Sequence, residues 1–422
     1  MKGILPISIN TIFWCFISGL RYLSDHSSNN NSPRPLSNAQ LLSAAKDVAV
    51  CLPAHNEELV LKDAIDSLQR LVPVRQIYVV SDGSHDQTAQ IARQMGCIVL
   101  EQNPGLGKAK ALQKIIAYFR LLDRYHYLLI ADADTIFDQN FLRHALPLFD
   151  PAKHVAVVAA YTKTRWQKHP GFSRRMLFVA YRMRLYGFIQ PIIMYGQTWH
   201  HTNVNPVIPG FACLYRTDIL RHLNFYAPGV ILEDFNMAFQ LHKQKLGTIA
   251  HHPSVIATTQ DPDNFADYRS QILRWNLGFF QTIKYWGVWP SFFWLSLGVS
   301  LIETFIFALL LFIIPTLLLL ALSYYFVPNL FPSDNSALIW LSTHWIELST
   351  IYAFLILADY LITIFVAFKE QEDKLSIYGL VFIFLRYVDA AIFLYAFKEA
   401  IATKSSGVWV PPERRSEPSP QQ

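Results

Sequence analysis

The sequence predicts an α/β protein with a largely parallel sheet in residues 47–285 and apolar helices flanking it. Short β-branched runs alternate with segments of helical spacing between residues 47 and 134, which is typical of a parallel sheet covered by helices on both faces. Long apolar stretches at residues 292–327, 348–368 and 375–397 are suited to a membrane. The charged fraction of 16% is below the value of about 25% that soluble domains carry.

The elements of the sheet can be placed from the change between the two periodicities. In order, they are strand 47–53, helix 56–71, strand 76–80, helix 85–95, strand 97–102, helix 107–122 and strand 125–134. The following region is mixed, with strands expected at 155–162, 211–216 and 247–251 and a helix at 233–245. Ligands of such sheets bind beyond the carboxyl ends of the strands, so functional residues are expected there.

The chain divides into five parts by composition. They are an N-terminal membrane anchor (1–22), a polar linker (23–46), a catalytic domain (47–285), interfacial and transmembrane helices (286–401) and a polar tail (402–422). The apolar segment 4–20 is at the lower length limit for a span. We favour an uncleaved anchor, with a cleavable signal peptide as the alternative, because no small-residue cleavage site follows cleanly.

Charge and cysteine content exclude several classes. A net charge of +5 without a long basic run or an RNA-binding motif gives no indication of nucleic acid. Basic residues interleaved with aromatics between Lys163 and Arg184 predict either a solvated helix face or a surface for anionic lipid headgroups. The four scattered cysteines form no disulfide or zinc pattern, which fits a reducing cytoplasm.

The distribution of lysine and arginine predicts the orientation in the membrane. The loop 328–345 contains neither residue and is expected outside, whereas Lys369 and Lys374 are expected inside with the catalytic domain. Residues 292–327 exceed one span and contain Pro315, which suggests an interfacial helix followed by a transmembrane helix. Arg386 and Asp389, three residues apart, are candidates for an ion pair. The number of spans stays open.

Polar motifs follow the first and second strands. These are LPAHNEE (52–58) and SDGSHDQT (81–88). Ser84 and Gln87 have the spacing of a helix capping box. That does not account for Asp82 and Gly83, where glycine permits close approach of the backbone and the carboxylate can accept from a base or ribose.

Carboxylates gather at two further positions. Asp132 and Asp134 leave the fourth strand as alternate residues, and a bend can bring them together around Mg²⁺ or Mn²⁺. Glu233 and Asp234 open a helix, which suits the helix dipole but equally a general base. The loop GLGK before a helix departs from a Walker A sequence, yet Lys108 can still reach a phosphate.

Six motifs occur in a fixed order, namely PAHNEE, SDGSHD, GLGKAKAL, DADT, the acidic pair and QILRW. In this order the sequence resembles the membrane-bound family 2 glycosyltransferases, which include cellulose, chitin, hyaluronan and poly-N-acetylglucosamine synthases. The resemblance covers about residues 48–275 and the flanking apolar segments. It implies a GT-A (Rossmann-like) domain, a nucleotide-sugar donor that is usually UDP-linked, a divalent metal and inverting transfer.

The resemblance also implies roles for individual residues. Asp234, with Glu233 and Arg274, would be catalytic, Asp234 as the base and Arg274 on the diphosphate. The nucleotide sugar would be bound by Ala54, Glu57, Asp82, Lys108 and Asp132. The metal would be held by Asp132 and Asp134, and the acceptor by Gln271 and Trp275 of the QxxRW motif. Ser81 and Leu232 depart from the family pattern, which puts acceptor identity and processivity in doubt.

The sequence therefore predicts a metal-dependent hexosyltransferase with a cytoplasmic catalytic domain in a multi-pass cell-membrane protein. Its partners are expected to be a nucleotide sugar, a saccharide or lipid acceptor and membrane lipid. The leading hypothesis is polysaccharide biosynthesis, in which the product is extruded. One alternative is a single transfer to a lipid, giving a glycolipid. A second is a catalytically silent membrane scaffold, against which the intact Asp132, Asp134, Asp234 and Arg274 argue.

Overall fold

The computed structural model describes residues 8–27, 34–166, 172–332 and 335–402 of the chain. Its centre is a mixed eight-stranded sheet with the order β3-β2-β1-β4-β7-β6-β8-β5. The strands are β1 (Val48–Ala54), β2 (Ile77–Asp82), β3 (Ile98–Gln102), β4 (Tyr127–Ala131), β5 (Ile136–Phe137), β6 (Val155–Thr164), β7 (Ala212–Arg216) and β8 (Thr248–Thr259). The first four strands are parallel, which confirms the predicted parallel sheet.

The other half of the sheet is mixed, because β7 runs antiparallel to both β4 and β6. Strand β8 pairs parallel with β6 and antiparallel with the short β5. Of the predicted polar tail (402–422), Ala402 ends α17 and residues 403–422 lie outside the described residues.

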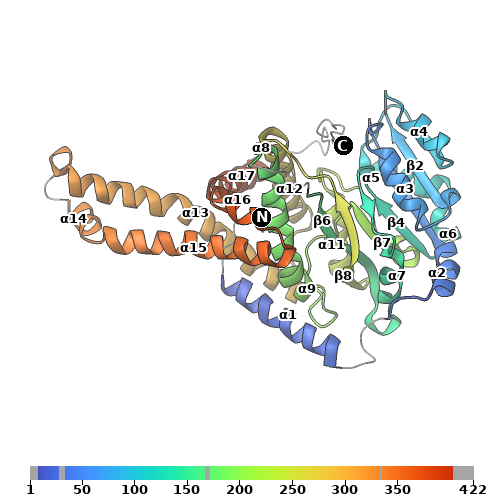
Figure 1. Cartoon of the computed structure of the whole chain (residues 1–422), viewed down its shortest axis with the longest axis horizontal. Coiled ribbons are helices and arrows are strands. Elements are labelled where there is room, and N and C mark those ends of the chain that lie inside the picture. The colour runs from blue at the N-terminus through green and yellow to red at the C-terminus, as the bar shows by residue number, and fades with distance from the viewer. Residues whose placement is uncertain (1–7, 28–33, 167–171, 333–334, 403–422) are drawn as a thin grey trace.

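Helices cover both faces of this sheet (Figure 1). One face carries α3 (Leu61–Gln69), α4 (Thr88–Gln94) and α7 (Phe141–Ala145), and the other carries α5 (Lys108–Tyr118) and α11 (Glu233–Gln244). Short helices α6 (Leu121–Arg124) and α10 (Thr217–Leu220) accompany α5. Strand β1 is buried at all its positions, because Val50 and Leu52 pack into one core and Ala49 and Cys51 into the other.

A second group of helices extends from the sheet domain to the membrane segments. It contains α8 (Arg174–Phe188), a π-helical turn (Ile189–Met194), α9 (Tyr195–Gln197), α12 (Phe265–Trp286), α16 (Lys374–Gly379) and α17 (Phe382–Ala402). Helix α17 packs along α12, and α8 packs against α15 (Trp345–Glu370). Arg386 of α17 does not pair with Asp389 as predicted, but with Asp359 of α15 at 2.6 Å.

Two helices project from the domain as a hairpin, with the short α14 (Ser336–Thr343) at its tip (Figure 1). These are α13 (Phe292–Phe326) and α15, the two helices of the described residues that are long and apolar enough to cross a membrane. The predicted division of 292–327 into two helices is wrong, because α13 is continuous through Pro315. Its 35 residues extend about 50 Å at ~1.5 Å per residue, so its first turns pack on the domain through Phe293 and Leu297.

Helix α1 (Ile9–Ser27) lies against α9, α13 and the π-helical turn. Its polar side chains face inward, since Arg21 donates to the carbonyl oxygen of Tyr195 (2.5 Å) and Asn10 donates to Ser300 Oγ (3.0 Å). Its outward face is apolar, with Ile9 81% and Phe16 63% exposed. The helix continues to Ser27, so it extends into the predicted linker, which also contains α2 (Asn38–Ala44).

Candidate active site

The loops after β1 and β2 form one side of the site and are fixed to each other. The amide of His85 donates to Asn56 Oδ1 (2.9 Å), and the amide of Glu57 donates to Thr88 Oγ1 (2.8 Å). The predicted capping box is wrong. Helix α4 begins at Thr88 without a side-chain cap, and Ser84 Oγ accepts from the amide of Asn56 instead.

Asp82, at the end of β2, holds the GLGK loop. Its carboxylate accepts hydrogen bonds from the amides of Leu106 and Gly107, both at 2.7 Å. Gly83 has a φ of +70°, and a methyl group there would lie 2.8 Å from the nitrogen of Gly105. Glycine is thus required where these loops touch, and Asp82 positions the loop that delivers Lys108. Ala54 and Glu57 are buried at the same edge, with 3% and 8% of their surfaces exposed.

Lys108, the first residue of α5, is at the centre of the site. Its Nζ lies 2.8 Å from Asp132 Oδ1 and 2.6 Å from Glu233 Oε1, and it donates to the carbonyl oxygen of Gly210 at 3.3 Å. The Lys108 and Asp132 side chains are about one third exposed, whereas Glu233 is 9% exposed. Three of the sequence motifs and the segment before β7 therefore meet around one ammonium group.

Asp234 adjoins this centre at the start of α11. Burial raises the pKa of Asp234 to about 7, and the charge of Glu233 acts in the same direction. Burial also raises the pKa of Glu233, but the positive charge of Lys108 and, more weakly, that of Arg274 outweigh this effect. The pKa of Glu233 is therefore lowered. Two adjacent carboxylates with pKa values driven apart are characteristic of acid–base chemistry. One stays ionised, and the other is suited to exchange a proton near neutral pH.

Gly210 closes the site from the segment before β7, and the sequence interpretation did not identify it. A methyl group on Gly210 would lie 2.3 Å from Asp234 Oδ1 and 2.8 Å from Glu233 Oε1.

We expect Gly210→Ala to reduce the transfer rate at least about tenfold, because displacing reacting groups by about 1 Å costs up to ~100-fold. The measurement is kcat at saturating donor. Gly19→Ala is the control, because nothing lies within 4 Å of a methyl group there; equal rates for both variants would contradict this geometry.

Asp132 and Asp134 follow β4 in a turn, which the amide of Thr135 closes by donating to the carbonyl oxygen of Asp132 (3.1 Å). Burial raises the pKa of Asp132, and the neighbouring Asp134 raises it further. Within the described part of the chain, no group of three His, Cys, Asp or Glu side chains is arranged to hold a metal. Magnesium is usually held by one or two carboxylates together with substrate phosphates and water, and this pair fits such an ion.

The QxxRW motif lies on α12, where Gln271, Arg274 and Trp275 are half-buried. Arg182 of α8, which is fully buried, donates from Nη2 to Gln271 Oε1 and lies 4.4 Å from the centroid of the Trp275 ring. The sequence interpretation missed Arg182, although it falls in the basic segment 163–184. Arg182 and Arg184 are 0% and 2% exposed, so neither the solvated-face nor the headgroup interpretation holds for them.

A comparison with known protein families identifies the domain that carries several of these motifs. Residues 49–223 match the family described as Glycosyl transferase family 2. The chain contains a family 2 glycosyltransferase domain. The matched domain runs from β1 to just beyond α10 and contains Asp82, Lys108, Asp132 and Asp134. Its mixed sheet with helices on both faces is the GT-A type of fold. Asp234 and the QxxRW residues lie beyond the match.

Individual proteins resemble this family 2 glycosyltransferase over different lengths. A poly-beta-1,6-N-acetyl-D-glucosamine synthase of Staphylococcus epidermidis is 22% identical over 384 residues, 87% of each chain. A dolichyl-phosphate hexose transferase of Haloferax volcanii is 41% identical over 64 residues, 15% of this chain and 28% of that protein. A solved mannosyltransferase of Pyrobaculum calidifontis, in complex with GDP-Man and Mn²⁺, has 17% identity and a TM-score of 0.49, covering 83% of this chain and 95% of that one.

Proposed function

We propose that the protein is an inverting, metal-dependent glycosyltransferase that moves a sugar from a UDP-sugar to a growing polysaccharide at the membrane. The observation that carries this proposal is Asp234, a half-buried carboxylate with a pKa of about 7 beside the Lys108–Asp132–Glu233 centre. The similarity to a polysaccharide synthase over 87% of both chains supports the polymeric product.

In this reaction Asp234 removes the proton of an acceptor hydroxyl as its oxygen attacks the anomeric carbon of the donor sugar. The bond from that carbon to the diphosphate breaks, and the nucleoside diphosphate leaves with the electron pair. In this proposal Lys108 and Arg274 stabilise the charge that develops on it. Asp132 and Asp134 would hold the metal, which supplies further positive charge at the diphosphate when bound.

The pKa of Asp234 predicts a pH dependence. A general base acts only when ionised, and its pKa is raised to about 7. We therefore expect kcat/KM to rise with pH, about tenfold per unit below pH ~7, and to level off above it. Initial rates between pH 5 and 9 with constant ionic strength test this. A flat profile down to pH 5 would mean that Asp234 retains an ordinary pKa or is not the base.

The proposed topology has the catalytic domain in the cytoplasm. Helices α13 and α15 run out and back, so both ends of the hairpin lie with the sheet domain (Figure 1). The loop between them has no Lys or Arg, whereas Lys369 lies in the last turn of α15 and Lys374 follows this helix on the domain side, as the positive-inside rule requires. Helix α17 is not among the helices of the described residues that are long and apolar enough to span.

A second candidate is a single transfer to a lipid acceptor, and the membrane hairpin favours it. Both candidate spans are largely uncovered, with Leu319 66% and Phe354 68% exposed. Two such helices among the described residues do not by themselves enclose a passage for a polymer. The partial likeness to a dolichyl-phosphate hexose transferase points the same way.

The test is radiolabel transfer by membranes containing the full chain, using a panel of UDP-sugars with Mg²⁺ or Mn²⁺. Asp234→Asn membranes are the matched control. Products are separated into organic-soluble and high-molecular-weight fractions. Asp234-dependent label in polymer would support the synthase and identify its donor, and label only in the organic phase would support the glycolipid enzyme. No transfer from any donor would refute both.

A further inference from the structure

Helix α8 carries two buried arginines, Arg182 and Arg184, which serve different neighbours. They are two residues apart and therefore project to nearly opposite sides of the helix, at ~100° per residue. Their exposed fractions are 0% and 2%. Buried arginines are retained when their guanidinium groups are paired, so the partners of each identify what α8 connects.

The partners of Arg182 belong to the acceptor side of the candidate site. Nη2 donates to Gln271 Oε1. The guanidinium carbon lies 4.4 Å from the ring centroid of Trp275 and 5.4 Å from that of Tyr268. One planar cation thus fixes an amide and an indole on successive turns of α12, through a charged hydrogen bond and a cation–π contact.

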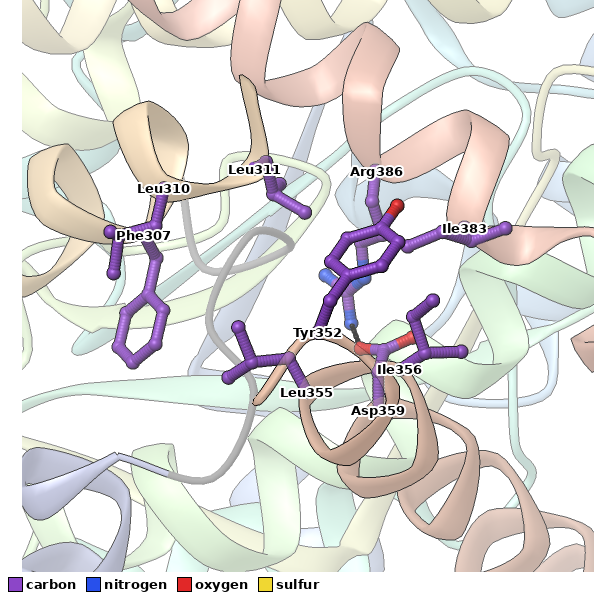
Figure 2. Close-up of a pocket in the computed structure, with 9 residues that line it drawn as sticks. All are labelled: Phe307, Leu310, Leu311, Tyr352, Leu355, Ile356, Asp359, Ile383 and Arg386. Atoms are coloured by element: carbon purple, nitrogen blue, oxygen red, sulfur yellow. Dashed lines mark hydrogen bonds and ion pairs between the residues drawn. The ribbon is translucent and has the colours of Figure 1, made fainter. Parts of the chain in front are cut away.

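The partners of Arg184 belong to the membrane hairpin. Its Nη2 lies 2.7 Å from Asp359 Oδ1, and its Nε donates to Thr363 Oγ1 at 2.7 Å. Arg386 of α17 reaches the same Asp359 oxygen at 2.6 Å. Figure 2 shows Asp359 and Arg386 facing each other beside an apolar groove between α13, α15 and α17. Asp359 therefore ties three helices together at the base of the hairpin.

A second connection reinforces the same arrangement. Asp389 of α17 accepts a hydrogen bond from Tyr181 of α8 at 3.0 Å and another from Tyr268 of α12. Helices α8, α12, α15 and α17 are thereby joined by buried polar contacts rather than by apolar packing alone. Such contacts depend on direction and distance, so they fix the rotation of α8 about its axis, and with it the position of Arg182.

We propose that Arg182 is a positioning residue that holds Gln271 and Trp275 in the geometry needed by the acceptor, and that the Arg184–Asp359 pair fixes its helix against the membrane hairpin. This inference rests on the proposed glycosyltransferase function, in which Gln271 and Trp275 face the acceptor. It assigns Asp359, which lies in a candidate membrane span, an influence on acceptor binding.

The first test compares Arg182→Met and Arg182→Lys in the full chain in membranes. The donor is the UDP-sugar that wild-type membranes use, and the acceptor is a short oligosaccharide of the same sugar. We expect acceptor KM to rise about tenfold or more in Arg182→Met and less in Arg182→Lys, which keeps the charge but loses the planar fork. The donor KM should change less than about twofold, and so should the rate at which the UDP-sugar is hydrolysed in the absence of acceptor. Equal effects on donor and acceptor would overturn the proposal.

A double substitution separates positioning from general loss of structure. If Arg182 acts through its two α12 partners, Arg182→Met should add almost nothing to a Gln271→Ala, Trp275→Ala background, because contacting residues are not additive. If Arg182→Met instead raised acceptor KM in this background by the same factor as in the wild type, the proposal would be overturned. Inactivity of the wild-type membranes would instead refute the proposed function, so the two failures are distinguishable.

The second test concerns the membrane end of the connection. Asp359→Asn should raise acceptor KM while leaving donor KM unchanged, and Asp359→Glu should restore part of the loss because the carboxylate is kept. Ile314→Ala in α13 is the control, because it truncates a buried side chain on a helix that carries no member of the polar network. If Asp359→Asn and Ile314→Ala alter donor and acceptor KM alike, the Asp359 connection is merely structural and this part of the proposal fails.

Discussion

Asp234→Asn is expected to lower kcat by about 10²- to 10⁴-fold, the contribution usual for a general base. The amide has nearly the shape of the carboxylate, so Ile208 can still donate its amide to the Asp234 carbonyl oxygen (3.2 Å) and the start of α11 is retained. The substitution removes the negative charge of the carboxylate and with it the ability to take a proton. The measurement is kcat at saturating donor and metal, at pH 8, where Asp234 is ionised because its pKa is about 7.

Stability measurements separate this chemical effect from damage to the fold. The pKa of Asp234 is raised from 3.8 to about 7 in the folded chain, so folding disfavours its ionised form; stability decreases as pH rises from about 4 through about 7 and levels off above that. At pH 8 the asparagine variant should therefore be at least as heat-stable as the wild type. Asp218→Asn, an exposed carboxylate paired with Arg216, should leave kcat within about twofold. A full rate in Asp234→Asn would exclude Asp234 as the base.

Lys108→Met is the second substitution with a large expected effect. It leaves Asp132 and Glu233 without the ammonium group now at 2.8 and 2.6 Å. Losing one partner of a fully buried pair costs about 3–5 kcal/mol. The Lys108 side chain is 32% exposed, so we expect a smaller loss, about 1–2 kcal/mol of unfolding free energy. We also expect kcat/KM to fall about 10²-fold or more, because a cation near the diphosphate is lost.

Lys110→Met provides the matched control for this substitution. Lys110 is exposed on the same helix, with its Nζ 4.4 Å from the ring centroid of Tyr226. Its loss removes the same charge from the chain without touching the carboxylates. We expect its kcat/KM to stay within about threefold of the wild type. Comparable losses in both variants would show that the general positive charge of α5 matters, and not the Lys108 contacts.

The parallel half of the sheet was predictable because its signals are local. Strands β1 to β4 each contain a short apolar run and are followed by polar loops, and their parallel register brings Ala54 and Ser81 side by side. Motifs at the ends of such strands must share one edge. Lys108 and Asp132 were expected at one nucleotide-sugar site only through the family resemblance, and the direct contact between them at 2.8 Å was not predicted.

Contacts between distant segments account for what the sequence did not reveal. Gly210 stands out only once β7 is known to run antiparallel to β4, and Arg182 looks like any helical arginine until α12 is packed against it. The capping-box prediction was wrong because α4 begins only at Thr88, and the Ser84 hydroxyl accepts from the amide of Asn56 instead. Arg386 pairs with Asp359 and not with Asp389. The Asp389 carboxylate instead accepts hydrogen bonds from two tyrosines on other helices.

The inverted arrangement of α1 has a practical consequence for handling the protein. Its inward side is held to the sheet domain by Arg21, whereas Ile9, Phe16 and Leu23 point outward and are more than half exposed. Water is a poor solvent for such a face. Excision of the α13–α15 hairpin would therefore not release a freely soluble enzyme. The trimmed protein would still require detergent or a bilayer, unless the outward residues of α1 were replaced by polar ones as well.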